Sequence, residues 1–232
     1  MKILALDTSS EACSAALLID NELISRFEIA PQKHSQLILP MCDSLIKEAD
    51  INLNQLDIIA FGQGPGSFTG LRIAAGVTQG IAFGSDLPVV GISTLAAISY
   101  AILSKTNNSL ILACIDARMQ EIYFGLYQKT ETHSVQLINK EIVTKAENIQ
   151  NTKAGNYVAV GSGWKEYEDE LTDVFKHCNI QATFSDVLPN ATDIAMLAKT
   201  HLELGKPSLQ AEHAQPVYLR NNVAKKPKAF KI

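Results

Sequence analysis

The glycine-rich segment 62–84 is the first place in the sequence where phosphate chemistry could occur. It reads GQGPGSFTGLRIAAGVTQGIAFG and holds seven of the chain's thirteen glycines. It follows the apolar run LDIIAF, which is typical of a buried strand, and a glycine-rich turn between a strand and a helix often binds a phosphate. The P-loop signature, however, requires Gly-Lys followed by Ser or Thr, which the chain lacks, and Thr69 stands where the dinucleotide signature requires its third glycine. Neither nucleotide motif is present.

The other reactive residue types do not form a catalytic set. The five histidines are too far apart for an HxxxH or HExxH metal-binding pair, and no GxSxG serine elbow occurs. The adjacent His177 and Cys178 would direct their side chains apart, which disfavours a Cys–His dyad. No two of the four cysteines are spaced as a CxxC pair, and we expect all four to be free thiols in a reducing cytosol. We therefore predict no catalytic residue and no metal site.

Small residues recur at intervals of four within the glycine-rich segment. This spacing places them on one side of a helix. Glycine inside a helix costs about 1 kcal/mol relative to alanine, so tertiary packing must hold this helix. One row consists of Gly76, Gly80 and Gly84, and the row beside it consists of Gly70, Ala74, Thr78 and Ala82.

The small residues have two interpretations, and the sequence leaves both open. In the first, the face packs tightly on the protein's own sheet, and a bulky residue at Gly76 or Gly80 would then damage folding more than binding. In the second, part of this face receives a helix from another subunit, because small side chains let two helices approach closely. The ridge beside it would take part in that contact; it consists of Ile73, Val77 and Ile81.

The elements that must position these residues occur in two similar series. The first is expected to contain strands at 3–8, 12–19, 22–30, 57–61 and 88–92, a helix at 35–49, a helix within the glycine-rich segment, and a helix capped by Ser93. After residue 109 the order strand, aspartate, turn, strand begins again, so Asp7 and Asp116 end equivalent strands. The second series is less complete, with an apolar run at 155–164 and helix-like stretches at 165–175 and 190–205.

This duplicated β-β-β-α-β-α order is similar to that of the actin, Hsp70 and sugar-kinase superfamily. It predicts an α/β fold of that class (ASKHA) with a reduced second domain, divided into residues 1–105, residues 106–220 and a tail at 221–232. The resemblance implies that the two strand-end aspartates face each other across a cleft for ATP and its metal, so that a remnant nucleotide cleft would contain Asp7, Thr8, Ser9 and Asp116. Alternatively, each aspartate accepts hydrogen bonds from its own turn, as aspartates at strand ends often do.

Charge is distributed unevenly along the chain. There are 20 Lys and Arg against 24 Asp and Glu, a net charge of −4, but residues 220–232 contain five basic residues and no acid. Residues 1–219 therefore carry 15 basic and 24 acidic residues, a net charge of −9. Such an acidic body repels nucleic acid at long range, which disfavours a protein that binds RNA alone. The sequence has no run of about 18 apolar residues and no signal-peptide pattern, so we expect a cytoplasmic protein with no membrane contact.

Three segments together resemble the TsaB (YeaZ) family: ALDTSSEACSAAL, the glycine-rich segment with its specific core GPGSFTGLR, and DARMQEIYFGLY. PVYLR near the C-terminus also fits, so the resemblance extends over about residues 1–220. It implies a non-catalytic paralogue of TsaD, the subunit that transfers a threonylcarbamoyl group to N6 of the adenosine 3′ of the tRNA anticodon (t6A). The implied partners are TsaD, the ATPase TsaE, a second copy of the chain in isolation, and tRNA only through the complex. No cofactor is expected on this chain, because ATP and metal would be bound by TsaD and TsaE.

In that family the first two helices form a helical bundle with the partner, which corresponds here to 34–45 and 69–81. The expected interface residues are His34, Leu37, Ile38, Met41, Leu45, Thr69, Gly70, Ile73, Ala74, Val77 and Ile81. Many relatives have glycine where this chain has Ala74, which is still small enough for close contact. The basic tail has two interpretations: a solvated end, or contact of Lys225, Lys226 and Lys228 with tRNA phosphates in the complex.

Two rival functions remain open from the sequence alone. One is an autonomous ATPase or phosphotransferase that uses Asp7 and Asp116 with a divalent metal. The other is a simple homodimeric interaction module. Protease activity is attached to the wider family by name, but the sequence supplies no nucleophile with a base beside it.

Overall fold

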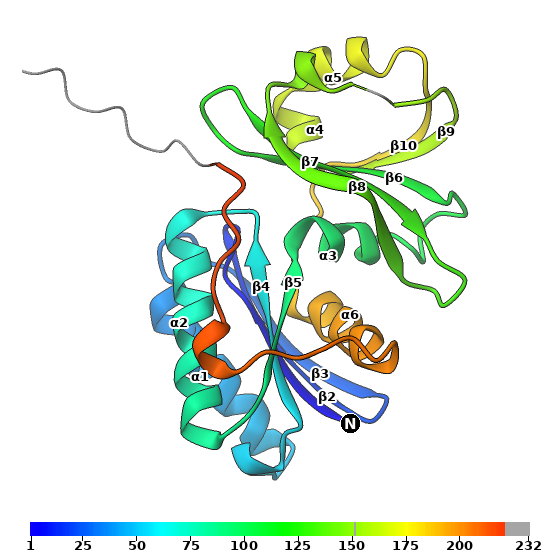
Figure 1. The fold of residues 1–232 in the computed structure, drawn as a ribbon. Helices are drawn as coiled ribbons and strands as arrows, with labels where there is room; N and C mark the ends of the chain where they lie inside the picture. The colour runs from blue at the N-terminus through cyan, green and yellow to red at the C-terminus, as the bar shows by residue number, and fades with distance from the viewer. Residues whose placement is uncertain (151, 221–232) are drawn as a thin grey trace, which may run out of the picture.

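The computed structural model describes residues 1–150 and 152–220, which fold into two five-stranded sheets with helices around and between them (Figure 1). No helix in these residues is long and apolar enough to cross a membrane.

The first sheet has the strand order β3-β2-β1-β4-β5. Its strands are β1 (Lys2–Asp7), β2 (Ala12–Ile19), β3 (Glu22–Ile29), β4 (Ile58–Gly64) and β5 (Val89–Ser93). Strand β1 pairs antiparallel with β2 and parallel with β4. Both faces of this central part are covered, which explains why β1 and β2 read as continuous apolar runs without alternation.

Helices α1 (His34–Glu48) and α2 (Phe68–Ser85) cover one face of the first sheet, and α6 (Ala191–Glu203) covers the other. Helix α2 begins at the N-cap Ser67, whose hydroxyl accepts a hydrogen bond from the amide of Gly70 at 3.3 Å. It ends at Asp86, which adopts a left-handed conformation with φ of 53°. The helix therefore starts beside the end of β4 and runs back along the sheet.

The second sheet repeats the order of the first. Its order is β10-β9-β6-β7-β8, formed by β6 (Leu110–Asp116), β7 (Ile122–Lys129), β8 (Val135–Thr144), β9 (Asn156–Val160) and β10 (Asn179–Phe184). All five strands are present, and only the helices are reduced. The three-residue helix η2 (Ala146–Asn148) follows β8 where α1 follows β3, and the short α4 (Gly163–Glu166) and α5 (Glu168–Val174) occupy the place of α2.

The two halves exchange their last helices. Helix α3 (Thr94–Ala101) follows β5, but its Leu95 and Ile98 pack against Ile111 and Val158 of the second sheet. Helix α6 follows β10, but its Ile194 packs on the first sheet. By packing, α6 thus belongs with the first sheet although it lies within the predicted range 106–220.

The chain returns across α2 as an irregular segment, the C-terminal strap (residues 209–220), drawn in red in Figure 1. The strap starts with a bridge between Leu209 and Val89 and contains the short helix η3 (Ala211–His213). The side chain of Gln79 on α2 donates to the carbonyl of Ala214 at 3.0 Å, and the amide of Val217 donates to the carbonyl of Gln63 at 2.7 Å. The strap therefore links β5, α2 and the end of β4.

Candidate functional site

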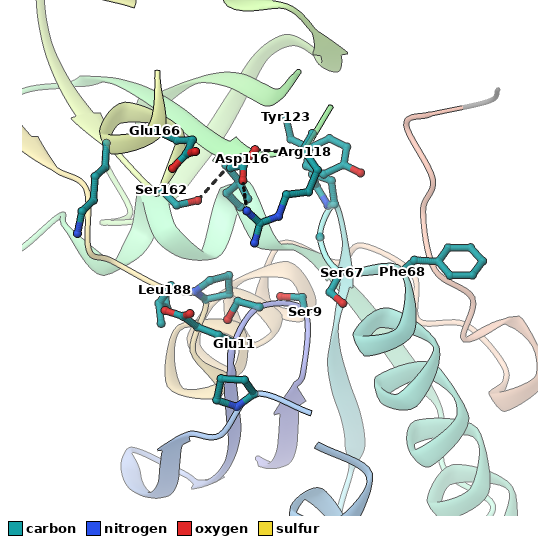
Figure 2. A pocket seen from close by; sticks show the side chains of 18 of the residues that line it. Ser9, Glu11, Ser67, Phe68, Asp116, Arg118, Tyr123, Ser162, Glu166 and Leu188 are labelled. Atoms are coloured by element: carbon teal, nitrogen blue, oxygen red, sulfur yellow. Dashed lines mark hydrogen bonds and ion pairs between the residues drawn. The ribbon is translucent and has the colours of Figure 1, made fainter. Parts of the chain in front are cut away.

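A cleft of about 760 Å³ lies between the two sheets, beside the ends of β1 and β6 (Figure 2). Strand-end turns and helix starts from both halves line it. These include Ser9, Ser10, Gly66 and Ser67 from the first half and Asp116, Arg118, Ser162 and Lys165 from the second. Of the predicted remnant nucleotide cleft, Ser9 and Asp116 line this space, whereas Asp7 and Thr8 are buried behind it.

Asp7 faces the interior of the first half. One carboxylate oxygen accepts hydrogen bonds from the amide of Ser9 at 3.1 Å and from its hydroxyl at 2.9 Å. The other oxygen has no partner among the described residues and packs against Gly62, where an added Cβ would lie 1.9 Å from it. Burial raises the pKa of Asp7 to about 6. Gly62 is thus required to accommodate the carboxylate.

Asp116 lines the cleft, but its oxygens are occupied by its own surroundings. One accepts hydrogen bonds from the amide of Arg118 at 2.7 Å and from the hydroxyl of Tyr167 at 3.0 Å. The other pairs with the guanidinium of Arg118 at 3.0 Å (Figure 2). The structure therefore favours the interpretation in which each aspartate accepts hydrogen bonds from its own turn. The alternative in which the two aspartates face each other across the cleft is not supported, because Asp7 is buried and does not line the cleft.

This arrangement does not fit the metal and nucleotide that the fold class implies. The unpartnered oxygen of Asp7 faces Gly62, and Asp116 is neutralised by Arg118. Among residues 1–150 and 152–220, no group of three or more His, Cys, Asp or Glu side chains could hold a metal ion. His177 and Cys178 lie against the carbonyls of Thr152 and Lys153, and burial raises the pKa of the Cys178 thiol, which lowers its nucleophilicity.

We expect the buried carboxylate of Asp7 to make the protein less stable as pH rises. The unfolded chain ionises this group near its usual pKa of 3.8, whereas the folded chain keeps the proton up to about pH 6. The folded state thus binds more protons between these values, and stability falls through that window. Urea denaturation gives the free energy of unfolding of wild type and of Asp7→Asn. From about pH 4.5 to about pH 7.5, the free energy of unfolding of the wild type should fall by about 2 kcal/mol relative to that of Asp7→Asn. Parallel pH curves for the two proteins would contradict this.

Helices α1 and α2 present the second candidate surface. The row of Ala74, Thr78 and Ala82 is fully buried on the first sheet. The glycine row is different, because a Cβ added at Gly76, Gly80 or Gly84 would meet no atom within 4 Å. This row faces away from the sheet, so the condition under which a bulky residue at Gly76 or Gly80 would damage folding is not met.

The predicted interface residues divide into two groups. Thr69 is exposed, and the half-buried members are Leu37, Met41, Ile73, Val77 and Ile81. Those buried inside the chain are His34, Ile38, Leu45, Gly70 and Ala74. The buried residues do not lie on the surface, so the prediction that they contact a partner directly is corrected. Helical periodicity identifies the apolar face of a helix, but it does not show which part of that face packs on the protein's own sheet. The open face, as we define it, consists of Leu37, Met41, Thr69, Ile73, Gly76, Val77 and Gly80. The predicted tail residues Lys225, Lys226 and Lys228 lie outside the described residues.

Two five-stranded sheets of identical order, with exchanged helices and a cleft between them, define a duplicated α/β protein of the actin-like class. Residues 19–228 match the family model TsaD, described as tRNA N6-adenosine threonylcarbamoyltransferase. The chain is 40% identical to "tRNA threonylcarbamoyladenosine biosynthesis protein TsaB" of Escherichia coli over 97% of this chain and 96% of that protein. It is 39% identical to the Haemophilus influenzae protein of the same name over 96% and 95%.

A solved structure agrees with these sequence matches. YeaZ from Pseudomonas aeruginosa superposes with a TM-score of 0.85 and 38% identity, over 94% of this chain and 99% of that one. The chain therefore belongs to the TsaB (YeaZ) family, within the wider group that the TsaD model describes.

Proposed function

We propose that this protein is a non-catalytic accessory subunit that binds a TsaD-type transferase and activates it for t6A formation in tRNA. The observation that carries the proposal is the open face. Its Gly76 and Gly80 face solvent on α2 in one row with Gly84, beside the half-buried Ile73 and Val77. Glycines inside a helix cost stability, and within this chain no packing offsets that cost. A helix from a partner, however, could approach these glycines closely.

The relatives' names support the process to which this subunit belongs. The E. coli and H. influenzae proteins are both named for tRNA threonylcarbamoyladenosine biosynthesis. TsaE would join the assembly, and tRNA would be reached through the complex in the cytoplasm. In isolation, two copies would pair through the same open face, because a self-complementary helix pair suits a two-fold dimer.

Activation requires the chain to bind one conformation of the transferase more tightly than others. A ligand shifts a two-state equilibrium only by its differential affinity for the two states. A difference of about 5.5 kcal/mol moves a population from about 1% to about 99%. A helix bundle that forms fully with only one state of the partner can supply a difference of this order.

The orientation of the reactive residues supports a non-catalytic role. Asp7 and Asp116 do not converge, and burial raises the pKa of Cys13 to about 11 and that of Cys42 to about 12, which keeps both thiols protonated. One solved relative is described as similar to a peptidase, yet no cysteine of this chain has the activated environment that a cysteine peptidase requires. TsaD and TsaE, rather than this chain, would bind ATP and metal.

A Val77→Glu variant tests the pairing surface. Val77 lies on the open face and is half-buried, so a glutamate there can reach solvent in the free chain but would be desolvated in the bundle. We expect a folded monomer by circular dichroism and sedimentation, with affinity for the transferase reduced about 100-fold or more. Val77→Thr is the control of matched shape and should still pair. A Val77→Glu protein that pairs like wild type would contradict the surface.

The ATPase alternative makes an opposite prediction for the isolated chain. An autonomous ATPase would hydrolyse ATP without partners and lose that activity in Asp7→Asn. Because Asp7 is buried and Asp116 is paired with Arg118, we expect phosphate release at the buffer rate from both wild type and variant. Hydrolysis that depends on Asp7 would contradict the accessory role. A simple homodimeric module would instead leave transferase activity unchanged when added.

A further inference from the structure

Two aromatic rings lie exposed where the start of α2 meets the C-terminal strap. Phe68 is 49% exposed and Tyr218 is 41% exposed, with ring centroids 5.5 Å apart and planes tilted by 38°. The guanidinium of Arg72 lies 3.8 Å from the centre of the Phe68 ring, and its Nε donates to the Tyr218 hydroxyl at 3.0 Å. Figure 2 shows Phe68 pointing away from the cleft toward the strap. Rings fixed in this way and left half in solvent are typical of a contact surface.

A strained loop lies beside the same end of the strap, next to Arg220. Arg118, Met119 and Gln120 all have left-handed backbones, with φ of 60°, 57° and 62°. Three such residues in succession, none of them glycine, are costly and persist only where the surroundings hold them. Arg220 does so, because its guanidinium donates to the carbonyl of Ala117 at 3.1 Å and to the carboxylate of Glu121.

The strained loop exposes the side chains of Arg118 and Met119. Arg118 is 84% exposed as a side chain and Met119 is 79% exposed as a residue. Strain of this kind is concentrated at functional sites, where it sets the position of a contact residue. The rim surface, as we define it, consists of Phe68, Arg72, Tyr218, Arg118 and Met119.

The rim surface carries positive charge in an otherwise acidic protein. Arg72, Arg118 and Arg220 outnumber the two carboxylates beside them, which belong to Asp116 and Glu121. Residues 1–219 have a net charge of −9, yet the chain continues from this surface into a segment with five basic residues and no acid over 220–232. The only strongly basic part of the sequence thus begins where the aromatic rings are exposed.

We propose that the rim surface binds unpaired nucleotides of the tRNA substrate within the assembled complex, an inference that rests on the proposed function. Exposed aromatic rings with arginines beside them stack nucleobases and neutralise phosphates, and this combination recognises single-stranded rather than paired RNA. Phe68 and Tyr218 stack bases of the anticodon loop, and Arg72, which no carboxylate pairs among the described residues, lies toward its phosphates. The local excess of arginine favours RNA over an additional protein contact.

The test uses the complex of this chain with the TsaD-type transferase and TsaE of the same organism. The probe is a fluorescent anticodon stem–loop RNA that carries the target adenosine, and anisotropy gives its Kd. We expect Phe68→Ala and Tyr218→Ala each to raise Kd about tenfold, because each removes one stacking ring. Tyr218→Phe keeps the ring and should retain most of the affinity. Phe27→Ala on β3 removes a ring of similar exposure, 46%, outside the rim surface and should leave Kd unchanged.

Sedimentation of the same samples separates the inference from the function on which it rests. If wild-type chain forms no complex with the transferase, the proposed function fails and the inference fails with it. If the complex forms and both alanine variants bind RNA like wild type, the inference alone is overturned. If the variants lose complex formation while the remaining complex binds RNA normally, the rim surface is a protein contact, and that result also overturns it.

Discussion

A Gly80→Leu variant is expected to fold more stably than wild type and yet to lose its partner. A side chain at Gly80 meets no atom of the chain within 4 Å, so nothing in the fold opposes it. Replacing glycine by leucine inside a helix gains up to about 1 kcal/mol in helix propensity. The same side chain fills the space that a partner helix needs, and overpacking of a close helix contact should weaken pairing about 100-fold or more.

The two effects are measured separately. Urea denaturation at several protein concentrations gives the free energy of unfolding while controlling for the stabilisation that pairing itself supplies. Titration with the transferase gives affinity. Gly80→Ala should show the same gain in stability with a smaller loss of affinity. Unchanged pairing by the leucine variant would show that a partner does not use this face.

A Gly70→Ala variant should have the opposite outcome on the same helix. A Cβ at Gly70 would lie 1.9 Å from the backbone carbonyl oxygen of Thr8, and no rotamer change relieves a clash between a Cβ and a backbone atom. The start of α2 would have to move off the β1–β2 turn, which also breaks the 2.7 Å hydrogen bond from the Thr8 hydroxyl to the Gly70 carbonyl. We expect a loss of about 3 kcal/mol or more in the free energy of unfolding.

Gly76→Ala is the matched control for this prediction. It makes the same substitution six residues further along α2, where no atom lies within 4 Å, and should increase stability by about 0.5 to 1 kcal/mol. Equal effects at the two positions, measured by urea denaturation, would mean that the two glycine rows are not distinguished by their surroundings. The comparison therefore tests which face of α2 meets the protein.

The local elements of the first half could be predicted because their signals are strong. Strand β2 occupies the predicted range 12–19, and Ser93 caps α3 as expected by accepting a hydrogen bond from the amide of Ala96. The second half was predicted less completely. Strands β8 and β10 are not among the predicted elements, because both are edge strands without a fully buried residue and neither has an apolar run.

The functional surfaces depend on details that a single sequence does not encode locally. Two rows of small residues on α2 have the same spacing, and only the tertiary structure shows that Ala74 faces the sheet while Gly80 faces solvent. The orientation of Asp7 depends on the absence of a side chain at Gly62, a residue distant in sequence. The meeting of Phe68 with Tyr218 depends on the path of the strap, which has no periodic pattern.

The measurement that tests the central claim most directly is t6A formation on tRNA by the TsaD-type transferase and TsaE, supplied with threonylcarbamoyl-adenylate. The assay is run without this chain, with wild type, with Gly80→Leu, and with Phe27→Ala as a control on a different surface. An accessory subunit that works through the open face predicts modification with wild type and Phe27→Ala, and little modification without the chain or with a folded Gly80→Leu protein. Modification that proceeds equally well without the chain would contradict the account.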